Sequence, residues 1–204
     1  MRCEQFAQMD GISTRPAMFT DLNVALNVPS YTTGWEAKAY TKVTFYVPDN
    51  WKSGRIWGRR NCDFSKNPGP NSCLTGGCNG GLGVPPATVA EWTLGGDSST
   101  GVDWYDVSLV DGYNLPMRIS NNKGCPVVDC PVDLGPNCPS PLKGPFDSTG
   151  FPVGCKSACF ANLDGNQESN CPNSYAYAYD EASGTALRTC ASSLKADYTL
   201  TFCP

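Results

Sequence analysis

The chain has 204 residues, a formal net charge of −4 and only 17% charged residues, and it contains no histidine. Without histidine a Ser-His-Asp triad, a Cys-His dyad and a His-ligated catalytic metal are excluded, and without a basic tract nucleic acid is not expected as a partner. No apolar run approaches about 20 residues, so no segment is expected to span a membrane.

The chain contains twelve cysteines, which is its strongest compositional feature. Structural zinc is the rival interpretation, but the sequence has neither histidine nor a C-x2-C knuckle. Disulfides in an oxidising compartment are therefore expected, and with them secretion. The first residues, MRCEQFAQMDGIS, contain no apolar segment typical of a signal peptide. Secretion would then use either an N-terminus that differs from this one or an indirect route.

In chain order, the first clear pattern is the alternation over residues 35–48, WEAKAYTKVTFYVP, which predicts a strand. A turn follows, and residues 54–60, GRIWGRR, predict a second strand. Side chains two positions apart share one face of a strand, so Arg55, Trp57 and Arg59 are expected to project to the same side.

A stretch rich in Gly, Pro, Asn and Cys occupies residues 61–86 and predicts a loop held by disulfides rather than a regular element. Residues 89–94 and 105–110 then predict two strands joined by a hairpin-like connection. Residues 115–120 predict another short strand.

The character of the sequence changes over residues 125–171, where six cysteines and many prolines fall with little periodicity. Strand patterns return near residues 186–190 and 196–203. The prediction is a mainly β protein, with a β-sandwich core domain formed by residues 1–124 and 172–204. Residues 125–171 would form a cysteine-rich lobe of loops and a short helix beside it.

Several long motifs resemble the thaumatin-like protein family, which includes thaumatin, osmotin and zeamatin. The motifs are GRIWGRRNCDF, LTGGC, VPPATVAEWTL, WYDVSLVDGYNLPM and the closing TLTFCP. The segments PAMFTDLNV and YVPDNWKSGRIWGRR are more similar to fungal members of the family. The resemblance covers residues 16–204 in order.

The resemblance implies a flattened β-sandwich, a small disulfide-rich lobe and an acidic cleft between them. The family's cleft motif is one Arg, one Glu and three Asp, and each matching position here holds the expected residue. Carried over position by position, the motif consists of Arg55, Glu91, Asp106, Asp111 and Asp180.

The resemblance also implies a set of disulfides. The implied pairs are Cys62–Cys73, Cys125–Cys190, Cys130–Cys171, Cys138–Cys155 and Cys3–Cys203. Cys78 and Cys159 remain, because their usual partners are absent; they either pair with each other or stay free. The residues around Cys3 do not match the family's usual first strand, which leaves the partner of Cys203 open.

A pair of carboxyl groups can hydrolyse a glycosidic bond when one is protonated and the other is ionised. Crowding acids in one cleft raises some of their pKa values, because like charges resist sharing a site. The expected roles are Glu91 as general acid and Asp106 as base or water activator. Arg55 would keep a neighbouring carboxylate ionised, and Asp111 and Asp180 would tune the field and bind sugar hydroxyl groups.

The alternative is an acidic groove that binds sugar without cleaving it. Carboxylates accept hydrogen bonds from sugar hydroxyl groups, and aromatic rings can stack on pyranose faces. The candidate rings are Trp92, Trp104, Tyr105 and Tyr113. Residue types alone do not decide between catalysis and binding.

Other residues have a structural interpretation. Trp57 and Phe45 are expected in the core rather than at a ligand. Asp97 and Asp103 are expected to be solvated in connections.

The resulting hypothesis is a secreted thaumatin-like protein that binds and hydrolyses β-1,3-glucan as an endo-acting enzyme, in wall remodelling or antifungal action. The alternative is a non-enzymatic β-glucan-binding or antifungal defence protein. The expected partner is β-1,3-glucan or another fungal wall polysaccharide. No cofactor, metal or nucleic acid is expected to bind, no membrane span is expected, and the protein is expected to be a monomer.

Overall fold

The computed structural model of the chain describes residues 5–12, 30–31, 34–65, 72–79, 82–95, 100–157, 171–176 and 180–204. These residues form strands and two short 3-10 helices, η1 (Asp180–Ser183) and η2 (Ser192–Leu194), and no α-helix occurs among them. The mainly β prediction is therefore confirmed. In the described part of the chain, no helix has the length and apolar character needed to cross a membrane.

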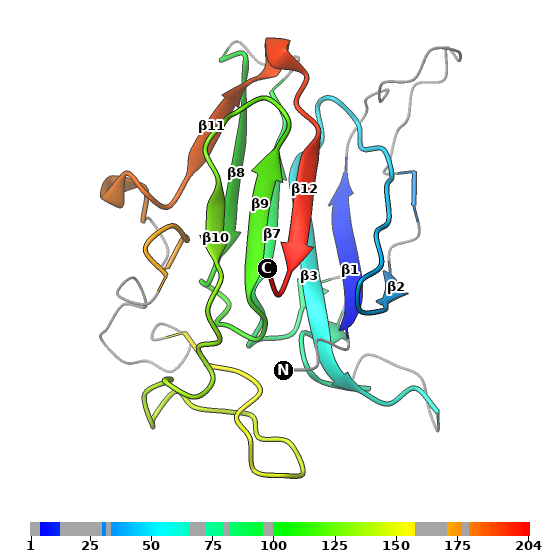
Figure 1. Cartoon of the computed structure of the whole chain (residues 1–204), viewed down its shortest axis with the longest axis vertical. Coiled ribbons are helices and arrows are strands. Elements are labelled where there is room, and N and C mark those ends of the chain that lie inside the picture. Colours follow the sequence, from blue (N-terminus) through cyan, green and yellow to red (C-terminus); the bar gives the residue numbers. More distant parts are fainter. Residues whose placement is uncertain are drawn as a thin grey trace.

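The larger sheet has seven strands, all paired antiparallel. The path runs β11 (Arg188–Ala191), β8 (Val102–Ser108), β7 (Val89–Thr93), β3 (Lys52–Cys62), β1 (Gln5–Ile12) and β2 (Gly34–Ala37). The seventh strand, β4 (Cys73–Thr75), pairs with the far end of β3. The long strand β3 therefore pairs with three strands, β1, β7 and β4, and Figure 1 shows it beside β1.

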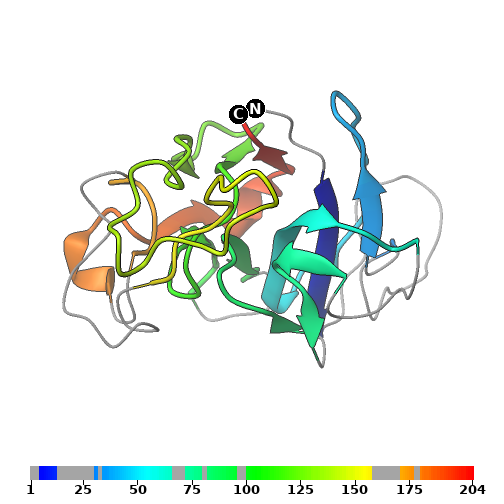
Figure 2. The same ribbon diagram turned by 90° about the horizontal axis from the view of Figure 1, so that it is seen from below.

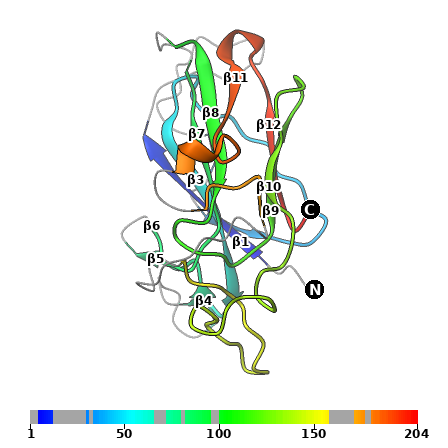
Figure 3. The same cartoon turned by 90° about the vertical axis from the view of Figure 1, so that its left-hand side faces the viewer.

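A second sheet of three strands lies against one face of the first. Its order is β10 (Val128–Cys130), β9 (Met117–Asn121) and β12 (Tyr198–Phe202). Figure 3 shows the two sheets edge-on as separate layers, as the sandwich prediction requires. A further two-stranded ribbon is formed by β5 (Cys78–Asn79) and β6 (Leu82–Gly83).

The core lies between the two sheets. Every second side chain of β8 points into it. Tyr105 and Val107 point inward and are fully buried, as are Met117 and Ile119 on β9. The ring of Tyr105 packs on Tyr198 of β12, with the ring centroids 5.1 Å apart. Alternate β8 residues therefore point to the opposite, outer face of the larger sheet.

Six strands occur where the sequence predicted them, but the predicted strand over residues 35–48 is wrong beyond β2. The chain turns at Tyr40, whose φ of 62° lies in the left-handed region, and the Thr41 amide bonds back to the Lys38 carbonyl at 3.2 Å. A residue in that conformation interrupts an extended strand. Residues 41–48 form no strand, although Phe45 packs against the core as expected.

The prediction that residues 61–86 contain no regular element is also wrong, because the short strands β4, β5 and β6 lie within them. Their shortness hides the alternation that sequence patterns depend on. By contrast, residues 131–157 contain no strand and gather at one end of the sandwich (Figures 1 and 2). The division into a core domain and a lobe stays a prediction.

Four of the implied disulfides are present: Cys62–Cys73, Cys125–Cys190, Cys130–Cys171 and Cys138–Cys155. Cys203 is also disulfide-bonded. Its implied partner, Cys3, lies outside the described residues, as do Cys159 and the side chain of Cys78.

Removing the Cys130–Cys171 disulfide by a double alanine variant is expected to lower the free energy of unfolding by about 3–4 kcal/mol. The two cysteines are fully buried and 41 residues apart, so the bond restricts a long loop of the unfolded chain. The matched control is Cys62–Cys73, which closes a loop of separation 11 and should contribute about 1 kcal/mol less. Chemical denaturation measures both, and a larger loss from the short loop would contradict the expectation.

Candidate functional site

The outer face of the larger sheet carries a row of three charged residues from three neighbouring strands. Arg55 on β3 lies directly opposite Glu91 on β7, and Glu91 lies directly opposite Asp106 on β8. Side chains opposite one another on antiparallel strands have Cβ atoms about 4.5–5.5 Å apart. The strand register thus brings together residues that are far apart along the chain.

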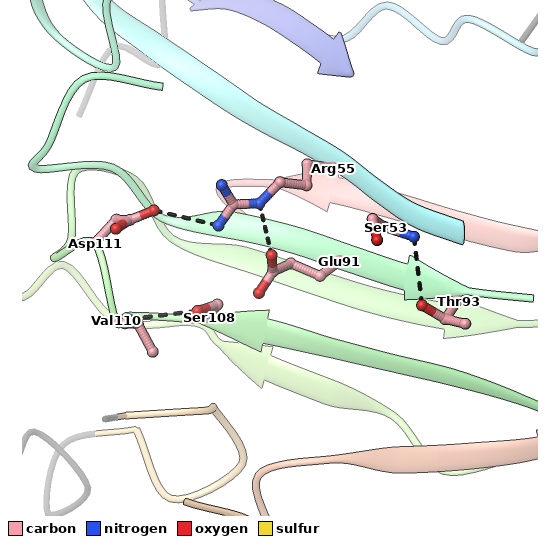
Figure 4. A network of polar contacts seen from close by, with 7 residues as sticks. All are labelled: Ser53, Arg55, Glu91, Thr93, Ser108, Val110 and Asp111. Atoms are coloured by element: carbon pink, nitrogen blue, oxygen red, sulfur yellow. Dashed lines mark hydrogen bonds and ion pairs between the residues drawn. The ribbon is translucent and has the colours of Figure 1, made fainter. Parts of the chain in front are cut away.

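Arg55 holds two carboxylates at once (Figure 4). Its Nε donates to Glu91 Oε1 at 2.6 Å, and its Nη2 donates to Asp111 Oδ2 at 3.2 Å. All three side chains are about one-third exposed. Burial opposes the charge of Arg55, but Glu91 and Asp111 outweigh it and raise the arginine pKa above its ordinary value.

Asp111 reaches Arg55 from the turn that follows β8. The Gly112 amide donates to the Leu109 carbonyl at 2.8 Å, which closes the turn. Gly112 has a φ of 89°, and a Cβ there would lie 2.6 Å from the Cys155 carbonyl oxygen. Glycine is therefore required next to Asp111, both for the backbone conformation and for the close approach of the neighbouring loop.

Asp106 differs from Glu91, the other acid of the row, because it is only 8% exposed. Its Oδ1 is buried without a hydrogen-bond partner among the described residues. Burial, and then the charge of Glu91, raise the pKa of Asp106 well above its usual range, against the opposing effect of Arg55. Glu181 adds a smaller increase. The row therefore pairs an ion-paired carboxylate with a carboxyl group that favours its protonated form.

A pocket of about 460 Å³ opens over this row. Its lining consists of Ser53, Arg55, Glu91, Trp92, Thr93, Trp104, Asp106 and Leu187. Three of these residues, Ser53, Thr93 and Leu187, belong to no site predicted from the sequence. The period of two would have found Thr93, which lies two residues from Glu91 on β7, but not Ser53, whose φ of 52° departs from the extended backbone in which that period holds. No three acidic or cysteine side chains within the described residues are arranged to hold a metal ion.

Asp180 is set apart from the other four acidic-motif residues. It is fully buried at the start of η1, whereas Asp111, which is also absent from the pocket lining, is about one-third exposed. Asp180 Oδ2 accepts the Ala176 amide at 2.8 Å, so Asp180 holds a neighbouring backbone segment in place. Because the carboxyl group of Asp180 has no exposed surface, it cannot contact a polysaccharide directly. The sequence pattern did not indicate that this residue is buried.

The four aromatic candidates separate clearly by exposure. Trp92, Tyr105 and Tyr113 are at most 5% exposed and belong to the core, whereas Trp104 is 38% exposed. Trp92 stacks on Trp51 with ring centroids 6.2 Å apart. Trp104 is the one ring of the four that both lines the pocket and remains accessible.

The thaumatin family profile matches residues 13–169, more than half of the chain. The chain belongs to the thaumatin family. Thaumatin-like protein 1 of Arabidopsis thaliana is 38% identical to this thaumatin-family chain over 203 residues, covering 85% of this chain and 76% of the relative. Pathogenesis-related protein 5 of the same plant is 40% identical over 186 residues, covering 78% and 73%.

Pathogenesis-related thaumatin-like protein 3.5 of Cryptomeria japonica is 40% identical over 182 residues, covering 74% of this thaumatin-family chain and 70% of the relative. Among solved structures, a thaumatin-like xylanase inhibitor is similar, with a TM-score of 0.46 and 18% identity. That match covers 100% of this chain and 95% of the inhibitor. The nearer resemblance to fungal members stays a prediction.

Proposed function

We propose that this thaumatin-family protein is secreted and that it binds and hydrolyses β-1,3-glucan in the pocket on the outer face of the larger sheet. The observation that carries the proposal is the row of Arg55, Glu91 and Asp106 along the pocket. Glycoside hydrolysis requires one ionised and one protonated carboxyl group, and here one carboxyl group of the pair is ion-paired and the other is buried.

The contacts of the two carboxyl groups favour the reverse of the roles expected from the sequence. Glu91 is ion-paired with Arg55 at 2.6 Å, so it is suited to act as base or nucleophile. Asp106 is buried, and burial raises its pKa, so it is suited to donate a proton to the leaving oxygen. We therefore assign Asp106 as the general acid and Glu91 as the ionised partner.

The remaining members of the acidic motif support this pair. Asp111 shares the guanidinium of Arg55 and so fixes the arginine side chain beside Glu91. It is one-third exposed and can also accept a hydrogen bond from a sugar hydroxyl group. Asp180 contributes by holding the backbone at Ala176.

The choice of β-1,3-glucan and of an endo-acting reaction rests on the resemblance to thaumatin-like proteins. The disulfides support folding in an oxidising compartment and therefore secretion. A secreted protein that acts on β-1,3-glucan would meet this polymer in the fungal wall. We therefore propose a fungal wall polysaccharide as the partner, in wall remodelling or antifungal action.

The purified protein is expected to release reducing ends from laminarin, a soluble β-1,3-glucan. Glu91→Gln keeps the size of the side chain but removes its charge, so the rate should fall by about 10²–10⁴-fold. Arg59→Gln is the matched control, because it changes a charge on the same strand outside the pocket lining.

The reducing-end assay and a binding assay together separate the two functions. Binding without release from the parent protein would contradict hydrolysis and support the non-enzymatic glucan-binding alternative. Absence of both binding and release would overturn the glucan proposal as a whole.

A further inference from the structure

The pocket contains a second row of residues beside the charged one. In the pairing of β7 with β8, Thr93 lies directly opposite Trp104, just as Glu91 lies opposite Asp106. Ser53 on β3 continues this row, since its amide approaches Thr93 Oγ1 at 3.4 Å (Figure 4). Trp104 in turn lies opposite Thr189 on β11. The second row is thus aromatic and hydroxylic, with no charged side chain.

The two rows are separated by two residues on each strand, which is about 7 Å along the sheet. Trp104 therefore lies beside the acid pair, close enough that a single sugar chain covers both. The indole is 38% exposed, although a large aromatic side chain is usually well buried. Leu187 adds a second apolar side chain to the lining.

We propose that Trp104 is the stacking platform of a glucan subsite next to the acid pair, and that the hydroxyl groups of Thr93 and Ser53 form its polar edge. The inference rests on the proposed function and names the residue that binds the flanking sugar ring. A β-linked glucose ring has equatorial hydroxyl groups and axial C–H bonds, so its face is apolar and its rim is polar. An exposed indole with hydroxyl groups beside it matches both parts.

The other exposed apolar side chains lack this setting. Phe146 is 52% exposed but lies in the 131–157 segment and is not among the pocket-lining residues. It is therefore a matched control for the loss of an exposed aromatic ring.

The test measures binding of a laminari-oligosaccharide by titration calorimetry, using Glu91→Gln as the background so that the ligand is not cleaved. Trp104→Ala should weaken binding about tenfold, which corresponds to about 1.4 kcal/mol. Trp104→Phe, which keeps a smaller ring, should recover most of the affinity, and Phe146→Ala should leave it unchanged. Bound oligosaccharide should protect tryptophan fluorescence from acrylamide in the background protein but not in Trp104→Phe.

The outcomes separate this inference from hydrolysis. Weaker binding by Trp104→Ala, together with no reducing ends from the parent, would support the subsite and contradict the enzyme. Cleavage by the parent, with equal binding by Trp104→Ala and its background, would support the enzyme and overturn the subsite. Failure of the background and parent proteins to bind any laminari-oligosaccharide would overturn both. Thermal unfolding of each variant verifies folding. If Trp104→Ala is unfolded, the acrylamide measurement on Trp104→Phe decides the question, and ligand protection that persists without Trp104 would overturn the subsite.

Discussion

Asp106→Asn is expected to lower the rate of laminarin hydrolysis by about 10²–10⁴-fold and yet to spare the cleavage of an aryl β-glucoside with an activated leaving group. Asp106 is buried with Oδ1 unpartnered among the described residues, so its carboxyl group favours the protonated form. An acidic phenol leaves without being protonated, so it does not need this proton donor. Glu91→Gln should abolish cleavage of both substrates, because each still needs the ionised partner.

The comparison of the two variants on the two substrates therefore assigns the roles. If Glu91→Gln spares the activated substrate and Asp106→Asn does not, Glu91 is the acid and the assignment from the sequence is the right one. If neither variant changes either rate, the carboxyl pair has no part in the reaction.

The same assignment fixes the direction of the pH dependence. A general acid must be protonated, so the rate should fall as the pH rises through the pKa of Asp106. Burial and the charge of Glu91 raise that pKa, and the alkaline limb of the profile should lie above the range of an ordinary aspartic acid. The limb should appear when the parent protein acts on laminarin and should be absent with the activated substrate, which needs no proton donor.

The stability of Asp106→Asn provides a control that does not depend on activity. The folded-state pKa of Asp106 is raised above its unfolded value of about 3.9. Between these two values the folded protein binds more protons than the unfolded chain, so the free energy of unfolding falls as the pH rises. Asparagine does not ionise, so the variant should be more stable than the parent at neutral pH. The difference in the free energy of unfolding between variant and parent should shrink below about pH 3.9. A variant that is less stable than the parent at neutral pH would contradict a raised pKa for Asp106.

The predictable part of this fold is the part with clear alternation. Strands β3, β7 and β8 follow from period-two patterns, and these three strands carry Arg55, Glu91 and Asp106. The register that places these residues opposite one another is set by long-range pairing, which periodicity does not encode. Only the resemblance to a known family connected them before the structure did.

Exposure was the harder property to predict. The segment DWYD places Trp104 and Asp106 on one face and Asp103 and Tyr105 on the other, but it does not say which face is covered. The three-stranded sheet covers the face of Tyr105, so Trp104 is accessible and Asp103 is not. The expectation that Asp103 is solvated is therefore wrong; Asp97 lies outside the described residues.

Asp103 and Asp106 are two buried acids of one strand with opposite surroundings. Asp103 Oδ1 accepts the Gly95 amide at 3.0 Å and the Ser192 hydroxyl at 2.7 Å, and its Oδ2 accepts the Tyr198 hydroxyl at 2.9 Å. Burial, and then the charge of Asp103, raise the pKa of Tyr198, so the phenol stays a donor. Asp103 therefore ties β8 to β12 and η2, whereas Asp106 is left with an unpartnered oxygen.

Asp103→Ala is accordingly expected to lower the free energy of unfolding by roughly 3–4 kcal/mol, because three donors lose a charged acceptor inside the protein. Urea denaturation of the oxidised protein measures the loss. Asp103→Asn keeps one acceptor oxygen and should fall between the parent and the alanine variant. Asp63→Ala, at an exposed position whose side chain accepts hydrogen bonds from the nearby Ser65, should change stability far less. A loss for Asp103→Ala as small as that of Asp63→Ala would mean that the hydrogen bonds of Asp103 contribute little to holding the two sheets together.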